Sequence, residues 1–307
     1  MSEEGGLQGR IIKGIAGFYY VETRAGDLYA CKARGRFRRD EIKPLPGDDV
    51  MFTVTHKDDM EGSLTEILPR RNVLVRPPVA NVDQALLFFS VRKPDPSLSL
   101  IDRYLISVSR TGLKAILAFN KSDIAAADET ELLKKTYAGA GVDVFIVSAG
   151  TGEGMDELLS ILSGRITTLA GPSGAGKSTL INRLCPHAKA QTGELSTGND
   201  RGKNTTRSSE LYRVEGAVLK GEETWLVDTP GFSALELPEM EPAELASEYP
   251  EFSAYSSECR FASCRHLSEP DCAVRSAVKG GIIPNSRYLS YVQFERELEQ
   301  RLQNRYR

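Results

Sequence analysis

The sequence lacks any uninterrupted apolar run approaching eighteen residues, so we expect no transmembrane helix and no membrane partner. Its cysteines number only five, an odd count, and no signal peptide is visible. A secreted, disulfide-linked fold is therefore disfavoured, and we expect a cytoplasmic protein. Cations are not in excess, because the formal net charge is -3. This balance argues against a general nucleic-acid coat, so any RNA contact must be local.

A phosphate-binding loop is predicted at residues 171–178, which fit the pattern G-x-x-x-x-G-K-[ST] at every fixed position. A β-rich run at 165–170 precedes it, and residues 177–184 have helical spacing. Backbone N–H groups in such a turn before a helix converge on phosphate oxygens. The predicted nucleotide-binding residues here are Gly171, Pro172, Ser173, Gly174, Ala175, Gly176, Lys177, Ser178 and Thr179.

Two side chains of this loop are predicted to be catalytic. Lys177 would reach the β- and γ-phosphates of the nucleotide, and Ser178 would ligate Mg²⁺. The simpler interpretation is a Gly-rich strand-to-helix turn. It does not account for a match at all four fixed positions with the correct flanks.

A guanine-reading loop is predicted at residues 120–123, whose sequence N-K-S-D fits the N-K-x-D pattern of GTPases. It follows the apolar run 115–119, so it lies at the carboxyl end of a probable strand, where open α/β sheets bind ligands. Asp123 can accept hydrogen bonds from guanine N1–H and the N2 amino group, which adenine lacks. Asn120 would brace the loops and the Lys121 stem would cover the base. A second strand, 142–147, leads to Ser148 and Ala149, which resemble the loop that backs guanine O6.

The order of these two loops is unusual, because the guanine-reading loop precedes the phosphate loop. In an ordinary GTPase the order is reversed. A circularly permuted GTPase domain explains the order, and permutation preserves a fold whose original termini lie close together.

The remaining GTPase elements are two switch segments. Asp228 and Gly231 fit D-x-x-G after a strand, so Asp228 would hold Mg²⁺ through water and the Gly231 amide would sense the γ-phosphate. In the polar stretch 192–207, Thr205 or Thr206 would close on Mg²⁺. Phe232 stands where many GTPases place a water-orienting Gln, so slow hydrolysis without a partner is expected.

A structural zinc site is predicted from the spacing C-x4-C-x-H-x5-C at residues 259–272. Three cysteines and one histidine are the usual ligand number and chemistry of structural zinc, and a closed set of ligands leaves no place for a catalytic water. Buried thiols are the competing interpretation, but the neighbouring residues are too polar for an apolar core. Cys31 and Cys185 stand apart as core thiols. The predicted ligands are Cys259, Cys264, His266 and Cys272.

The first seventy or so residues predict a small β-barrel. Short β-like runs alternate with Gly turns at 9–13, 17–23, 27–31, 49–55 and 62–67. An OB-type barrel, a common nucleic-acid platform, is expected, with an SH3-like barrel as the alternative.

A basic hairpin between two of these strands predicts an RNA-binding face, because its cations suit phosphates and nearby rings suit bases. The rings are Phe18, Tyr19, Tyr20, Tyr29 and Phe37. A solvated charged hairpin is the alternative. The predicted RNA-binding cations are Lys32, Arg34, Arg36, Arg38 and Arg39.

The predicted fold class is multidomain α/β. An OB-type barrel covers 1–72, the circularly permuted P-loop GTPase domain 73–235, and a zinc-binding C-terminal domain with helices 236–307. Residues 285–307 read as a helix with Tyr291, Phe294, Leu298 and Leu302 on one stripe, which would pack against the GTPase domain.

Taken together, the small barrel, N-K-x-D, S-A, G-x-S-G-x-G-K-S-T, G-x-x-T-T, D-T-P-G-F and C-x4-C-x-H-x5-C resemble the bacterial ribosome small-subunit-dependent GTPase A family over nearly the whole chain. The resemblance implies a role in late maturation of the small (30S) ribosomal subunit, with GTP hydrolysis stimulated by that subunit. The small subunit and its rRNA, GTP and GDP are thus the expected partners of a monomer, with one zinc per chain and Mg²⁺ with GTP. Asn204 departs from the family, which commonly has His there.

Two other functions fit parts of the sequence. A GTP-regulated RNA-binding module with little turnover is compatible with Phe232 and Asn204. A P-loop metabolic kinase shares the phosphate loop, but the guanine-reading loop and the lack of an obvious acceptor-site motif count against it.

Overall fold

The computed structural model describes residues 6–33, 37, 42–75, 78–186, 209–228 and 236–305. These residues form two compact units. The first comprises those within Met1–Gln84, Leu159–Ala170 and Ser178–Phe232, and the second those within Ala85–Leu158, Gly171–Lys177 and Ser233–Arg307. Among the described residues, no helix combines the length and apolarity that a membrane span requires.

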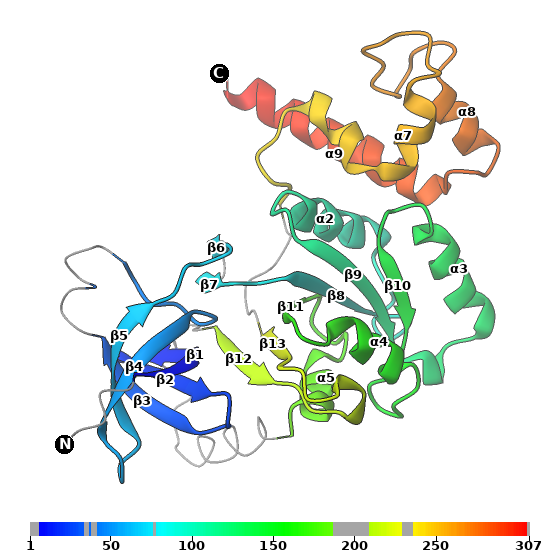
Figure 1. The fold of residues 1–307 in the computed structure, drawn as a ribbon. Coiled ribbons are helices and arrows are strands. Elements are labelled where there is room, and N and C mark those ends of the chain that lie inside the picture. The colour runs from blue at the N-terminus through cyan, green and yellow to red at the C-terminus, as the bar shows by residue number, and fades with distance from the viewer. Residues whose placement is uncertain are drawn as a thin grey trace. The chain divides into compact units, whose positions relative to one another are not determined.

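The N-terminal strands close into a barrel in the order β1-β2-β3-β5-β4, which is the order of an OB fold (Figure 1). Strands β3 and β5 pair in parallel and the other pairs are antiparallel. The barrel interior contains Ile11, Val21, Cys31, Phe52 and Leu64, all fully buried. All five predicted strands are present and the OB-type prediction is confirmed. The strands are β1 (Leu7–Ile15), β2 (Phe18–Thr23), β3 (Leu28–Ala33), β4 (Asp49–His56) and β5 (Glu61–Ile67).

A short hairpin of β6 (Val73–Val75) and β7 (Pro78–Ala80) follows the barrel. The next strands form a sheet in the order β10-β9-β8-β11-β13-β12. Strand β8 is buried along all seven residues, as a central strand of a mainly parallel sheet must be. The members are β8 (Gln84–Ser90), β9 (Lys114–Asn120), β10 (Asp143–Ile146), β11 (Ile166–Ala170), β12 (Glu210–Arg213) and β13 (Trp225–Asp228).

Parallel pairing joins β9 to β10 and β11 to β13, whereas β12 pairs antiparallel with β13. The connections are helical, as parallel strands require. They are α2 (Leu98–Ser109), η1 (Ser122–Ile124), α3 (Ala127–Tyr137), α4 (Met155–Leu162), α5 (Lys177–Leu184) and η2 (Ala217–Leu219). The observed β11, α5, β9 and β10 match the runs predicted from sequence to within one residue at each end.

The C-terminal region is helical and has its own apolar core, which includes Tyr249, Phe252, Tyr291 and Phe294. Its last helix packs against α2, so the predicted contact with the GTPase region is present (Figure 1). Leu302, the last residue of the predicted stripe, is only half-buried. The elements are η3 (Pro242–Glu248), α7 (Pro250–Ser256), α8 (Ala273–Lys279) and α9 (Asn285–Arg305).

A buried ion cluster, here called the Arg287 triad, joins α2, α7 and α9. The Arg287 guanidinium donates to Asp102 at 2.6 Å and to Glu251 at 2.7 Å. All three side chains are at most 7% exposed. The Tyr249 ring lies 4.6 Å from the Arg287 guanidinium carbon. Since each charge has a partner, the burial of three ions is tolerated here.

Candidate functional site

The phosphate loop lies between the end of β11 and the start of α5, where its backbone needs glycine. Gly171 has φ 149°, and a Cβ there would lie 2.0 Å from the Phe88 carbonyl oxygen. Gly176 has φ 98°, and its Cβ would lie 2.3 Å from Asn120 Nδ2. Both distances are far below any real contact, so only glycine fits at these two positions. The loop therefore packs closely against β8 and the guanine-reading loop.

Lys177 is the first residue of α5 and its ammonium lies inside the phosphate loop. Nζ donates to the carbonyl oxygens of Gly171 and Pro172, each at 2.7 Å. The Lys177 ammonium is therefore positioned where it can bind the phosphates of a nucleotide. Ser178 and Thr179 are exposed on the first turn of α5, so their hydroxyls are accessible.

Asn120 connects the three predicted nucleotide loops. Its buried amide donates to the Ala175 carbonyl at 2.8 Å, and its Oδ1 accepts the Ala149 N–H at 2.8 Å. One side chain thus joins the phosphate loop, the guanine-reading loop and the loop after β10. The bracing role predicted for Asn120 is therefore what its contacts show.

Asp123 is exposed and available to a base. One of its oxygens accepts the Ser148 hydroxyl at 2.6 Å, and Ser148 Oγ in turn accepts the Thr151 N–H at 3.1 Å. The hydroxyl orients the carboxylate, so Ser148 acts through Asp123. The sequence pattern predicts for Ser148 only a place in the loop that backs the base, and the hydrogen bond to Asp123 adds this orienting role.

A loop at residues 91–95, directly after β8, also touches both nucleotide loops, and no sequence motif marks it. The Lys121 ammonium donates to the Lys93 carbonyl. A Cβ at Gly174 would lie 3.2 Å from Pro94 Cδ, which is close contact. The one feature that could have predicted a place for this 91–95 loop at the nucleotide site is its position at the carboxyl end of a parallel strand.

Asp228 is the last residue of β13 and stands opposite Leu169 in the parallel register. It therefore lies beside the strand that leads into the phosphate loop. The other predicted switch residues, Asn204, Thr205, Thr206, Gly231 and Phe232, lie outside the described residues.

The four predicted metal ligands converge on one point. Cys259 Sγ lies 3.9 Å from Cys272 Sγ, and His266 Nδ1 lies 3.6 Å from the former and 3.4 Å from the latter. The ligand atoms of Cys259, Cys264, His266 and Cys272 all lie within 4.8 Å of one another. All four residues could hold one metal ion, and none of the three cysteines is in a disulfide.

Burial lowers the pKa of the His266 imidazole, which keeps it in the neutral form that binds metals. The ligand loop is anchored on α9, since the Tyr288 hydroxyl donates to the His266 carbonyl at 2.8 Å and the Tyr291 hydroxyl to the Arg265 carbonyl at 2.6 Å. Cys31 and Cys185 are buried elsewhere, as predicted, and burial raises the pKa of each thiol to about 12. Both are therefore unreactive core thiols.

Only part of the predicted RNA face lies within the described residues. Lys32 is exposed, with Nζ 4.9 Å from the centre of the Phe18 ring. The prediction was wrong for Tyr29 and Phe37, because both rings pack in the barrel core at 8% and 6% exposure and cannot stack on bases. The remaining cations of the hairpin, Arg34, Arg36, Arg38 and Arg39, lie outside the described residues.

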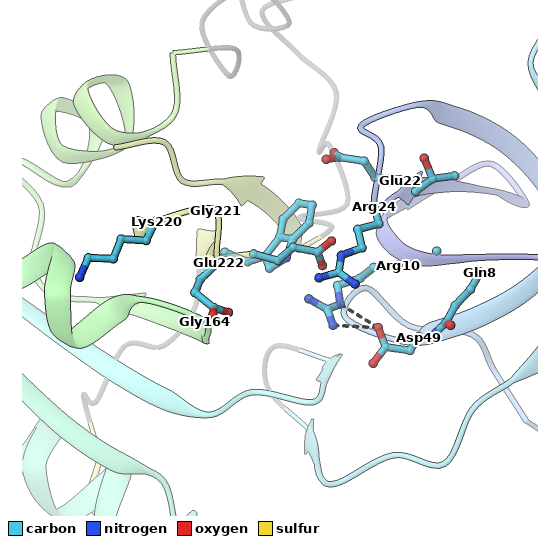
Figure 2. A pocket seen from close by; sticks show the side chains of 13 residues that line it. Gln8, Arg10, Glu22, Arg24, Asp49, Gly164, Lys220, Gly221 and Glu222 are labelled. Atoms are coloured by element: carbon cyan, nitrogen blue, oxygen red, sulfur yellow. Dashed lines mark hydrogen bonds and ion pairs between the residues drawn. The ribbon is translucent and has the colours of Figure 1, made fainter. Parts of the chain in front are cut away.

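A polar cavity of about 600 Å³ lies in the first unit and contains no predicted nucleotide residue (Figure 2). Opposite charges face one another there. Arg10 pairs with Asp49 at 2.8 Å, as the dashed lines in Figure 2 mark, and also lies 5.8 Å from the centre of the Trp225 ring. The size of this cavity alone does not make it the nucleotide site, because none of the residues that line it belongs to the phosphate loop 171–178.

Comparison with known proteins gives consistent matches. The family model for the RsgA GTPase matches residues 67–238, and that for the RsgA N-terminal domain matches residues 8–62. The small ribosomal subunit biogenesis GTPase RsgA of Alkaliphilus metalliredigens is 44% identical over 292 residues, 95% of this chain and 98% of the relative. That of Caldanaerobacter subterraneus is 45% identical over 303 residues, 98% of this chain and 99% of the relative.

Two solved structures are also similar. The crystal structure of YjeQ from Thermotoga maritima has a TM-score of 0.73 and 32% identity, and the match covers 96% of this chain and 99% of that one. The structure of YloQ, described as a circularly permuted GTPase, has a TM-score of 0.71 and 35% identity, with 97% and 96% coverage.

Proposed function

The chain belongs to the RsgA GTPase family, and from this premise we propose that it binds the small ribosomal subunit, acts in the late maturation of that subunit, and is stimulated by it. It hydrolyses GTP to GDP and phosphate, as its family does. The observation that carries the proposal is the bridging amide of Asn120, which ties the phosphate loop to the loops that would hold the base. The proposal includes the division of the chain into a barrel domain at 1–72, a GTPase domain at 73–235 and a zinc-binding domain at 236–307.

In the proposed site, Lys177 would bind the phosphate oxygens, and Ser178 and Asp228 would hold Mg²⁺. When bound, Mg²⁺ neutralises charge on the phosphates. Asp123, oriented by Ser148, accepts the guanine N–H groups, and Lys121 covers the base. These assignments account for the close packing of the loops around Asn120.

The switch residues complete the proposal. Thr205 or Thr206 and Gly231 respond to the γ-phosphate, so the GTP form differs from the GDP form in the region that follows. Neither Phe232 nor Asn204 can accept a proton at neutral pH. We therefore attribute slow intrinsic hydrolysis to the isolated protein and assign the ordering of the switch to the ribosomal subunit.

The metal proposed for the cysteine–histidine cluster is zinc, in a structural role. Zn–S bonds of about 2.3 Å at tetrahedral angles separate ligand atoms by roughly 3.5–3.8 Å. The separations of 3.4, 3.6 and 3.9 Å among Cys259, His266 and Cys272 fit this geometry. The proposal also includes a cytoplasmic monomer, with the basic hairpin from Lys32 to Arg39 as an rRNA contact.

Purified small subunits are expected to accelerate GTP hydrolysis by about tenfold or more, because ordering a switch loop supplies groups that the isolated site lacks. Phosphate release is measured with and without small subunits, and large subunits serve as the control. The GTP-analogue form should also bind small subunits more tightly than the GDP form. Unchanged hydrolysis together with equal binding of the two forms would contradict the proposal. Hydrolysis of ATP at a comparable rate would favour a kinase-like enzyme.

Base selectivity is expected to change in Asp123→Asn. The new amide donates where the carboxylate accepted, so GTP affinity should fall by about tenfold or more while xanthosine triphosphate, whose C2 carbonyl can accept, gains relative affinity. Titration with fluorescent analogues of the two nucleotides measures this ratio. Asp128→Asn, an exposed helix position, removes the same charge and is the matched control. An unaltered ratio in Asp123→Asn would remove the guanine assignment.

A further inference from the structure

The hydroxyl of Ser90 closes the 91–95 loop. Ser90 is the last residue of β8, is 2% exposed, and donates from Oγ to the Pro94 carbonyl at 2.6 Å. The next residue, Val91, donates its N–H to the Asn120 carbonyl at 2.8 Å. The loop is therefore fixed at its start by the guanine-reading strand and at Pro94 by a buried side chain.

The closed loop presents the Lys93 carbonyl to the Lys121 ammonium. Both lysines have a positive φ, 53° at Lys93 and 68° at Lys121. Such a conformation is uncommon outside glycine and persists only where the surroundings enforce it. The backbone is held in this unusual conformation at both Lys93 and Lys121, and the two residues contact one another. We infer that the surrounding structure fixes the position of the Lys121 side chain.

Pro94 extends the same loop to the phosphate side. Its Cδ would lie 3.2 Å from a Cβ at Gly174, so the ring packs directly on the phosphate loop. The Pro94 carbonyl that Ser90 holds thus belongs to the residue that touches Gly174. One hydroxyl consequently influences both the residue that covers the base and the loop that binds the phosphates.

We propose that Ser90 is a positioning residue of the nucleotide site, which holds the 91–95 loop so that the Lys93 carbonyl anchors Lys121 over the purine ring. This inference rests on the proposed function and deepens it. The contact is with the face of the base rather than its edge, so it favours retention of any purine nucleotide, whereas Asp123 discriminates guanine.

The test is the dissociation of fluorescent GDP and of the matching inosine nucleotide, which lacks the N2 amino group, from the full chain. Ser90→Ala leaves the Pro94 carbonyl without its donor and is expected to release both nucleotides about tenfold faster. Pro94→Ala, an exposed substitution in the same loop, should also speed release. Ser107→Ala removes an equivalent hydroxyl bond, to the Arg103 carbonyl at 2.8 Å on α2, and should release at the unsubstituted rate.

A second measurement distinguishes positioning from a general loss of stability. If Ser90 acts largely through Lys121, Ser90→Ala speeds GDP release by a clearly smaller factor in the Lys121→Ala background than in the unsubstituted protein, and the part that remains reflects the contact of Pro94 with Gly174. Full additivity, or release from Ser90→Ala and Pro94→Ala within twofold of the unsubstituted protein, would overturn the inference. Failure of the unsubstituted protein to bind either nucleotide would overturn the proposed function itself.

Discussion

Lys177→Ala is expected to lower the rate of GTP hydrolysis by at least about 10³-fold, with or without small subunits. The ammonium sits between the Gly171 and Pro172 carbonyls at the base of the phosphate loop, and the described part of the loop supplies no other side-chain cation. Alanine leaves the phosphate charge to backbone dipoles and Mg²⁺ alone. Single-turnover phosphate release measures the loss without interference from GDP release.

The control for this variant is Lys114→Ala, which removes the same charge from an exposed ion pair with Asp143 at 2.7 Å. Surface pairs contribute little, so its turnover should equal that of the unsubstituted protein. Substantial hydrolysis by Lys177→Ala would place the phosphate site elsewhere in the chain.

Removal of the metal is expected to unfold the C-terminal region. About one zinc per chain should be found by metal analysis, and Cys272→Ser should lose it, because a serine hydroxyl does not replace a thiolate ligand. Cys272 is also the N-cap of α8, and its Sγ accepts the Arg275 N–H at 3.5 Å. Serine is itself a good N-cap, so this substitution keeps the helix start and isolates the contribution of the metal.

Hydrogen exchange of α8 and of residues 257–271 reports the result, and loss of protection there is the expected outcome. Cys185→Ala, which changes a buried thiol outside the cluster, should retain the zinc. A metal-free protein in which these residues stay protected would contradict the structural role of zinc.

Local motifs predicted much of this molecule correctly because their geometry is local. The phosphate loop and α5 follow from glycine positions and helical spacing within a few residues, and the metal cluster follows from a short ligand spacing. The closed barrel was predicted from short alternating strands separated by turns, but not which rings its interior takes up.

Tyr29 and Phe37 show why composition alone fails for the barrel surface. Tyr29 lies on β3 two residues before the buried Cys31, so the alternation of the strand turns both inward, and Phe37, which follows the strand, packs on the same core. Contacts between residues far apart in the sequence could not be predicted either. Nothing near Arg287 in the sequence indicates Asp102, and the 91–95 loop carries no motif although it contacts Lys121 and Gly174.

The Arg287 triad limits how this chain can change over time. Replacing Arg287 leaves the Asp102 and Glu251 carboxylates buried without their shared cation, at a cost of about 3–5 kcal/mol, whereas exchanging all three residues for apolar ones of similar volume can be neutral. A change from the ion triad to three apolar residues that begins at Arg287 therefore passes through a destabilised protein. Positions 102, 251 and 287 are therefore expected to vary together among descendants of this sequence, as one inherited character rather than three.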